Sequence, residues 1–156
     1  MESTWDGLPV AREPPYAACV VVWRRAPHGR EFLVLHRLHA GGPDHEGDWA
    51  WTPPAGARLP GESPEVTAAR ELLEETGLEL SVEPAADAAP SADVAHYVAE
   101  CPAGETVVLD GEHDRFAWVT LEEAVARCLP PDVGTGIAKV AARLDTHDAD
   151  GAAGYA

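Results

Sequence analysis

The stretch Gly56-Ala-Arg-Leu-Pro-Gly-Glu-Ser-Pro-Glu-Val-Thr-Ala-Ala-Arg-Glu-Leu-Leu-Glu-Glu-Thr-Gly-Leu78 joins a glycine-bearing turn to a short amphipathic helix. Ser63 can act as the N-cap, and Pro64 follows at the first helical position, where its missing N–H costs nothing. Gly77 tolerates a positive φ directly after the last turn. The sequence therefore predicts a helix of about three turns with both ends defined.

One side of this predicted helix is apolar. With the helical period of 3.6 residues, Val66, Ala69 and Leu73 fall on one side, and Leu72 and Thr76 lie at its margin.

The opposite side of the helix carries Glu71, Glu74 and Glu75, because spacings of three and four residues bring side chains together. Like charges this close destabilise an isolated helix, and a divalent cation is the simplest way to offset their repulsion. Carboxylate oxygens on a preformed helix suit Mg²⁺ or Mn²⁺. Glu62 enters from the preceding loop and can reach the same side. The pattern therefore predicts a site for a hard divalent cation.

The spacing of these residues resembles the Nudix box. Gly56, five residues, Glu62, seven residues and then Arg70-Glu-Leu-Leu-Glu-Glu-Thr-Gly-Leu78 fill every fixed position of that motif. An ordinary acidic surface helix would explain the amphipathic pattern but not the spacing of the glycine and the first glutamate. The resemblance implies an α/β protein with the Nudix fold, in which a mixed β-sheet is sandwiched between α-helices.

The resemblance also implies a reaction. Nudix proteins typically use a divalent metal to hydrolyse a pyrophosphate bond in a nucleoside diphosphate linked to another group. Arg70 is expected to orient a glutamate, and Glu62 is expected to hold the loop or to join the outer shell of the metal. The expected metal ligands are Glu71, Glu74, Glu75 and the backbone carbonyl of Ala55.

The general base is left open between two positions. In some members of the family it is a box glutamate, here Glu71, and in others it belongs to a later loop. Glu112, in the segment Asp110-Gly-Glu-His-Asp-Arg-Phe-Ala-Trp118, is the candidate of the second kind. His113 and Asp114 are weaker candidates, and a solvated acidic loop explains the same segment equally well.

Candidate substrate-binding residues are aromatic or basic. Trp49 and Trp51 can stack on a base, although tryptophans at alternate positions are as often strand packing. Arg37 and Arg58 can supply positive charge to a polyphosphate. Tyr97 lies where some dinucleoside polyphosphate hydrolases carry a tyrosine, and we expect such a substrate or a (deoxy)nucleoside triphosphate. The alternative is a Nudix-fold sensor that binds a nucleotide without cleaving it.

Composition narrows the remaining choices. A chain of 156 residues suits one domain, and its net charge of −16 disfavours binding to nucleic acid or to anionic membranes. The sequence contains no apolar run long enough to span a bilayer and no basic-then-apolar leader, so we expect a cytoplasmic protein. A homodimer is compatible with the sequence. Cys19, Cys101 and Cys128 are odd in number and widely spaced, which predicts free thiols.

Periodicity and turn residues divide the chain into segments. We expect an extended arm over residues 1–15, a Nudix domain over 16–145 and a flexible tail over 146–156. Strands are predicted at 16–25, 31–38, 79–82, 92–101, 105–109 and 116–120, and helices beyond the box at 121–129 and 137–144.

Overall fold

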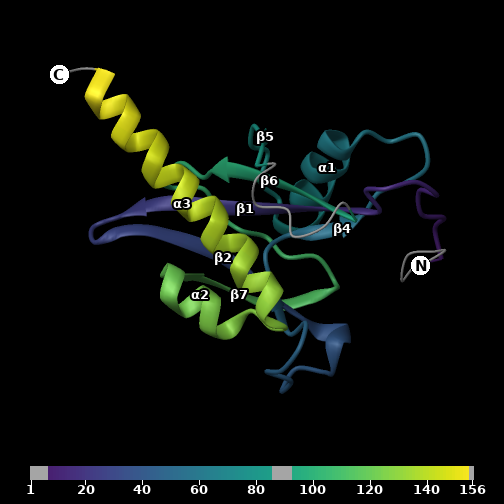
Figure 1. The fold of residues 1–156 in the computed structure, drawn as a ribbon. Helices are drawn as coiled ribbons and strands as arrows, with labels where there is room; N and C mark the ends of the chain where they lie inside the picture. The colour runs from purple at the N-terminus through teal and green to yellow at the C-terminus, as the bar shows by residue number, and fades with distance from the viewer. Residues whose placement is uncertain (1–6, 86–92, 155–156) are drawn as a thin grey trace.

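The computed structural model describes residues 7–85 and 93–154 and shows a mixed sheet covered by helices (Figure 1). Within these residues seven strands form one sheet in the order β3-β2-β1-β6-β5, with β4 pairing with β1 and β7 pairing with β2. The strands are β1 (Ala17–Ala26), β2 (Gly29–Arg37), β3 (Trp51–Thr52), β4 (Ala55–Ala57), β5 (Glu83–Pro84), β6 (Val94–Glu100) and β7 (His113–Val119). The helices are η1 (Leu38–Ala40), α1 (Pro64–Thr76), α2 (Leu121–Arg127) and α3 (Pro131–Gly154). The predicted fold class is confirmed.

The centre of the sheet is the long β1–β2 hairpin, closed by the turn at Pro27 and His28. Ala26 pairs with Gly29 across this turn, and Gly29 adopts a φ of 130°. β6 runs parallel to β1, whereas the other strand pairs are antiparallel. The two predicted hairpin strands are confirmed to within two residues at their ends.

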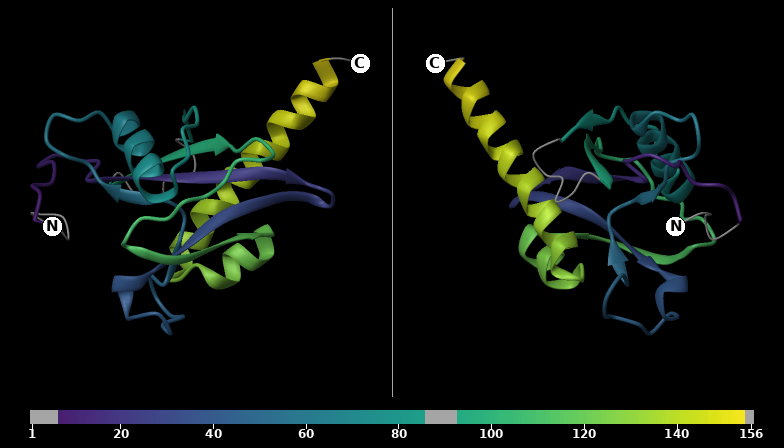
Figure 2. Two further views of the ribbon diagram at one scale, coloured as in Figure 1. Left: turned by 180° about the vertical axis from the view of Figure 1, so that it is seen from behind. Right: turned by 45° about the vertical axis from the view of Figure 1, so that its right-hand side comes forward.

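Each face of the sheet carries its own apolar core. Val20 and Val22 of β1 point into a core shared with Leu72 of α1. Val21 and Trp23, which alternate with them, point into a second core that contains buried residues of α2 and α3. α1 therefore covers one face, and α2 with α3 covers the other, as Figure 2 shows.

Both ends of α1 form as predicted. The Ser63 hydroxyl accepts a hydrogen bond from the Val66 N–H at 3.2 Å. Gly77 adopts a φ of 73° and its N–H donates to the Leu73 carbonyl at 2.8 Å. The next helix, α2, begins with a capping box between Thr120 and Glu123.

The apolar side of α1 formed by Val66, Ala69 and Leu73 is exposed. Val66 is 53% exposed and Leu73 is 44% exposed, and Ala69 is exposed beside them. The helix is rotated so that its buried side brings Leu72 onto the sheet and carries Glu75 inward. The buried residues of α1 are Thr67, Ala68, Leu72, Glu75 and Thr76.

Two predicted strands are wrong. Residues 79–82 form no strand, and Leu80 and Val82 instead pack at the border of the α1-side core. Residues 105–109 are likewise irregular. The Val108 N–H donates to the Thr76 carbonyl at 2.8 Å, so this segment caps the end of α1 rather than a sheet edge.

The chain ends differ from the sequence division as well. α3 begins at Pro131 and extends through residues 146–154 of the expected tail. The expected arm before residue 7, the loop at 86–91, the first residue of the strand predicted at 92–101 and the last two residues lie outside the described residues.

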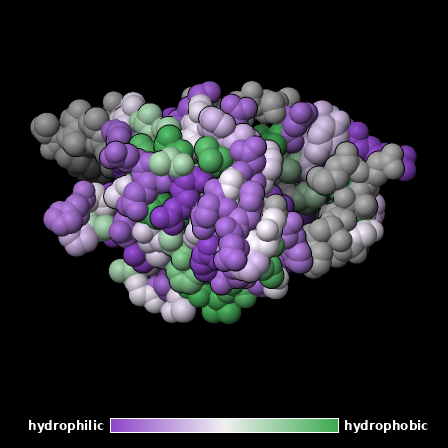
Figure 3. Space-filling view, turned by 90° about the horizontal axis from the view of Figure 1, so that it is seen from below, coloured by the Kyte–Doolittle hydropathy of each residue, from purple (hydrophilic) through white to green (hydrophobic). Residues whose placement is uncertain are grey.

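The three cysteines are free thiols. No helix in the described part of the chain has the length and apolar character to cross a membrane. The face shown in Figure 3 is mostly hydrophilic, with apolar side chains in small patches.

Candidate metal centre

Gly56 explains why the box begins with a glycine. It lies in β4, where it pairs with Ala18 of β1, and the carboxyl group of Glu71 rests directly against its Cα. A Cβ built at this position would overlap that carboxyl group. The contact therefore requires glycine and fixes how closely α1 approaches β4.

Glu62 is held by a dense set of donors. Nε and Nη2 of Arg70 donate to its two carboxylate oxygens at 2.7 and 2.8 Å, and the Thr67 hydroxyl donates at 2.8 Å. The Leu59 N–H donates at 3.2 Å. The Arg70 hydrogen bonds hold the pKa of Glu62 down at about 2, despite partial burial. These hydrogen bonds make Glu62 a brace of the loop, and its predicted role at the metal stays a prediction.

Arg70 extends this brace to the helix glutamates. Its Nη1 donates to Glu71 at 2.8 Å and to Glu74 at 3.3 Å, and its Nη2 also donates to the Ala57 carbonyl at 3.0 Å. The Glu74 side chain is 56% exposed. The three box glutamates therefore do not meet at one point, because Glu74 stays at the rim while Glu71 and Glu75 turn inward.

Glu75 is the most deeply buried acid of the site, with 2% of its surface exposed. Its carboxylate accepts the Ala55 N–H at 3.0 Å, so the structure uses the amide of Ala55, and the predicted role of its carbonyl stays a prediction. Burial, followed by the charge of Glu71, raises the pKa of Glu75 to about 9. Among the described residues no basic side chain forms an ion pair with this carboxylate.

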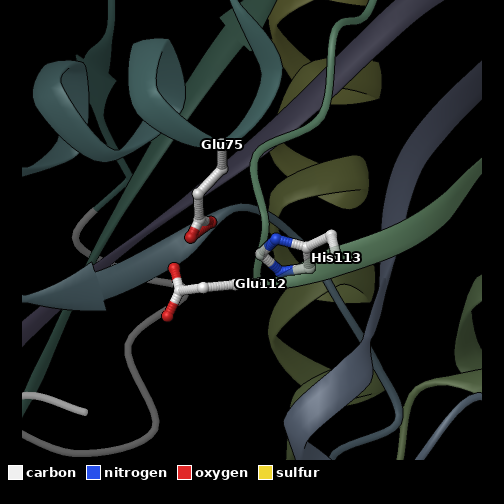
Figure 4. Close-up of side chains that lie close together, drawn as sticks. All are labelled: Glu75, Glu112 and His113. Atoms are coloured by element: carbon white, nitrogen blue, oxygen red, sulfur yellow. The ribbon is translucent and has the colours of Figure 1, made fainter. Parts of the chain in front are cut away.

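Glu112, directly before β7, and His113, the first residue of β7, complete a cluster with Glu75. Ligand atoms of Glu75, Glu112 and His113 all lie within 4.8 Å of one another. Figure 4 shows the two carboxylates facing each other with the imidazole ring beside them. Burial, followed by the charge of Asp110, raises the pKa of Glu112 to about 7, and Arg37 opposes this shift.

His113 is oriented by a carboxylate. Its Nδ1 lies 2.8 Å from an oxygen of Asp110, and the ring is 7% exposed. Burial lowers the pKa of His113 even though Asp110 opposes this effect, which favours the neutral ring. With Nδ1–H donating to Asp110, Nε2 is left with its lone pair, the arrangement found for metal-bound histidines.

The donor set fits a divalent cation. Burial also raises the pKa of Glu71 to about 7, against the stabilising charge of Arg70. Carboxyl groups packed this closely cannot all ionise unless a cation compensates them. Oxygen-rich sites suit Mg²⁺ and Mn²⁺, and the added imidazole is compatible with Mn²⁺ and its neighbours in the first transition row.

Only some of the predicted substrate-binding residues are available to a ligand. Trp51 is 4% exposed, its Nε1 donates to Glu46 at 2.7 Å, and its ring packs edge-on against His36. Trp51 is therefore strand packing. Trp49 is 50% exposed with a φ of 66° and can contact a ligand.

The remaining three candidates separate in the same way. Arg58 is 6% exposed and its guanidinium is occupied by the N-terminal arm and the Glu62 carbonyl, so it does not face a substrate. Tyr97 is 8% exposed within the α1-side core, so it is also a packing residue. Arg37 is exposed at the end of β2, where it pairs in register with His113.

The sequence did not reveal two parts of this centre. It ranked His113 only as a weaker base candidate and gave Asp110 no role. The available signal was the proximity of two acids and a histidine in Asp110-Gly-Glu-His113. These groups face α1 only because β7 begins at His113, which the sequence did not predict.

Comparisons with known proteins agree with this architecture. The model of the NUDIX domain matches residues 14–144. An Ap4A hydrolase from C. elegans, solved as a binary complex, is 27% identical and superposes with a TM-score of 0.68, covering 83% of this chain and 97% of that one. A Nudix hydrolase from M. smegmatis is 20% identical with a TM-score of 0.68, covering 92% of this chain and 93% of that one. At this identity the likeness supports the shared fold only.

A curated relative places the domain in a longer chain. The octanoyltransferase of Myxococcus xanthus is 32% identical over 137 residues, which make up 80% of this chain but only 36% of that protein. The chain therefore spans about a third of the length of this relative.

Proposed function

The chain belongs to the Nudix family, and from this premise we propose that it is a metal-dependent hydrolase of a pyrophosphate bond in a nucleotide. The observation that carries the proposal is the cluster in which Glu75, Glu112 and His113 bring ligand atoms within 4.8 Å of one another. Glu75 is buried there without an ion-pair partner among the described residues. A cation that binds beside this acid would compensate its charge and favour the ionised carboxylate.

We assign Glu75 as the principal metal ligand, with Glu71 beside it and Glu74 reaching in from the rim, which leaves the Glu112 carboxylate beside the metal without a ligand role. His113 and the Ala55 carbonyl are available as further donors. A bound divalent cation would stabilise charge on the phosphate oxygens and lower the pKa of an attacking water. Arg70 keeps Glu71 and Glu74 in place through the hydrogen bonds described above.

The proposed general base is Glu112. Its competitor, Glu71, already accepts a hydrogen bond from Arg70 at 2.8 Å and rests against Gly56, so it is less free to take a proton from water. Glu112 lies at the open end of the cluster, where a general base must lie within hydrogen-bond reach of the water.

The proposed substrate is a dinucleoside polyphosphate or a (deoxy)nucleoside triphosphate. The 27% identity to an Ap4A hydrolase over nearly all of that protein supports the first of these. Arg37 would bind the polyphosphate, since its charge lies next to Glu112 and His113. Trp49 is the available indole for stacking on a base.

A nucleotide screen tests this proposal. Wild-type protein is incubated with dinucleoside polyphosphates, nucleoside triphosphates and sugar nucleotides with Mg²⁺ or Mn²⁺, and products are separated by ion-exchange chromatography. Glu75→Gln and Glu112→Gln should abolish hydrolysis, whereas Glu122→Gln, an exposed glutamate of α2, should leave it unchanged. Binding of a nucleotide without release of any product would instead indicate the sensor.

A further inference from the structure

We infer that Arg58 is a positioning residue for the metal centre. It acts by tying the loop at residues 58–63, between β4 and α1 (the box loop), to the N-terminal arm. The inference rests on the proposed function, because it concerns how the same glutamates are held. Arg58 is 6% exposed and lies two residues after Gly56, yet it touches none of the clustered ligands.

The guanidinium of Arg58 is bound mainly by backbone carbonyls. Its Nε donates to the Pro15 carbonyl at 2.6 Å and its Nη2 donates to the Glu13 carbonyl at 2.7 Å. Its Nη1 donates to the Glu62 carbonyl at 2.8 Å. The Glu13 carboxylate adds a longer contact at 3.2 Å, but the Glu13 side chain is 70% exposed. The planar guanidinium of Arg58 therefore joins the N-terminal arm to Glu62, near the end of the box loop.

The arm is a suitable anchor because it is itself fixed. Val10 and Ala11 are 4% and 3% exposed, and the Ala11 N–H donates to the Arg58 carbonyl at 2.8 Å. On its other side the Arg58 N–H donates to the Tyr16 carbonyl at 2.8 Å. The backbone at this position is thus held between the arm and β1 before its side chain reaches the loop.

Two arginines then act in series on the helix glutamates. Arg58 holds the backbone of Glu62, and the Glu62 carboxylate accepts hydrogen bonds from Nε and Nη2 of Arg70. Arg70 in turn donates to Glu71 and Glu74. Loss of the first link loosens the loop that carries Glu62, so Arg70 keeps its contacts to Ala57, Glu71 and Glu74 but its Glu62 partner is less firmly placed.

The geometry requires arginine rather than any cation. Three carbonyl oxygens are met by three different nitrogens of one rigid fork, whereas a lysine presents a single ammonium on a flexible stem. Outer-shell partners of metal ligands typically contribute about 10–100-fold in metal affinity. Arg58 acts on the metal ligands only through Glu62 and Arg70. We therefore expect its removal to weaken metal binding by about 10-fold, the lower end of this range.

The test measures Mn²⁺ binding to the nucleotide-free full chain by electron paramagnetic resonance, together with hydrolysis rates and thermal melts. Arg58→Met removes the fork, and Arg58→Lys keeps the charge if the first variant fails to fold. Ile137→Val, in the core on the opposite face of the sheet, controls for general destabilisation. Glu13→Gln controls for the exposed carboxylate, because it retains the backbone carbonyl.

We expect the Mn²⁺ dissociation constant to rise about ten-fold in Arg58→Met and by less in Arg58→Lys, and to stay unchanged in both controls. Adding Glu62→Gln to Arg58→Met should weaken binding little further, since both lie on one path. Arg58 variants that lower the melting temperature like Ile137→Val but bind Mn²⁺ like the wild type would overturn the positioning role alone. A wild-type protein that binds no Mn²⁺ would overturn the proposed function with it.

Discussion

Replacing Glu75 with glutamine should stabilise the metal-free protein while removing its activity. The substitution keeps the shape of the side chain and an oxygen that accepts the Ala55 N–H. It removes an acid that is 2% exposed and whose pKa is raised to about 9, first by burial and then by Glu71. The new amide can also donate to Glu112. A residue kept in spite of its cost to folding is what a functional site requires.

The sign and size of the effect follow from proton linkage. Below the ordinary pKa of 4.5, Glu75 is neutral in both the folded and the unfolded state, so the substitution changes little there. Between 4.5 and 9 the unfolded chain gives up this proton while the folded protein keeps it, so wild-type stability falls as pH rises. At pH 7 the gap is about 2.5 pH units, or about 3 kcal/mol at about 1.4 kcal/mol per unit. For a domain of this size the difference corresponds to roughly 6–12 °C in melting temperature.

Thermal melts in EDTA at pH 5 and pH 8 provide the assay. Glu75→Gln should melt above the wild type, and the difference should be larger at pH 8. Glu74→Gln is the matched control, because its side chain is 56% exposed and should change stability by less than about 0.5 kcal/mol. A Glu75→Gln protein that melts at or below the wild type at pH 8 would refute the reasoning.

Three further predictions concern the surroundings of the site. Gly56→Ala should lower the hydrolysis rate by about 100-fold, because the new Cβ displaces the Glu71 carboxyl group; an unchanged rate would contradict the contact. Glu62→Gln should destabilise the protein by roughly 2 kcal/mol at pH 7, and this loss should shrink as pH falls from 4.5 towards 2, since the Arg70 hydrogen bonds depress the pKa of Glu62; urea unfolding at pH 7 and pH 3 measures it. Thr120→Ala should lower stability by about 1 kcal/mol through the lost N-cap and leave turnover intact; a melt and a rate on one sample check both.

Local signals in the sequence were sufficient to predict where α1 begins and ends and where the two hairpin strands lie. Ser63 and Gly77 act on backbone groups within a few residues, so their roles do not depend on the rest of the fold. β1 and β2 are joined by a two-residue turn, and their pairing is equally local. The family motif then supplied the fold class, which periodicity alone did not provide.

The orientation of α1 was not predictable from its own pattern. Val66 and Leu73 form an apolar side, but the helix packs Ala68 and Leu72 on the sheet and carries Glu75 inward, towards Ala55, Glu112 and His113. These surroundings are assembled from segments far apart in the chain. The same holds for Arg58, whose charge suggested a substrate contact until the N-terminal arm supplied carbonyl partners.

Short irregular segments produced the remaining errors. Residues 79–82 alternate polar and apolar side chains and residues 105–109 include a short apolar run, and both segments pack apolar side chains against the α1-side core without pairing as strands. Val108 uses its N–H to complete the end of α1, which no pattern in the sequence indicates. The role of Trp51 was ambiguous because a tryptophan side chain suits both burial in a core and stacking on a base.

Cleavage of a dinucleoside tetraphosphate, followed by ³¹P nuclear magnetic resonance in the presence of Mg²⁺, tests the central claim most directly. Wild-type protein should generate new terminal phosphate resonances, and the reaction should stop on addition of EDTA and be absent in Glu75→Gln. Product formed at the wild-type rate by Glu75→Gln, or in EDTA, would contradict hydrolysis at the cluster of Glu75, Glu112 and His113.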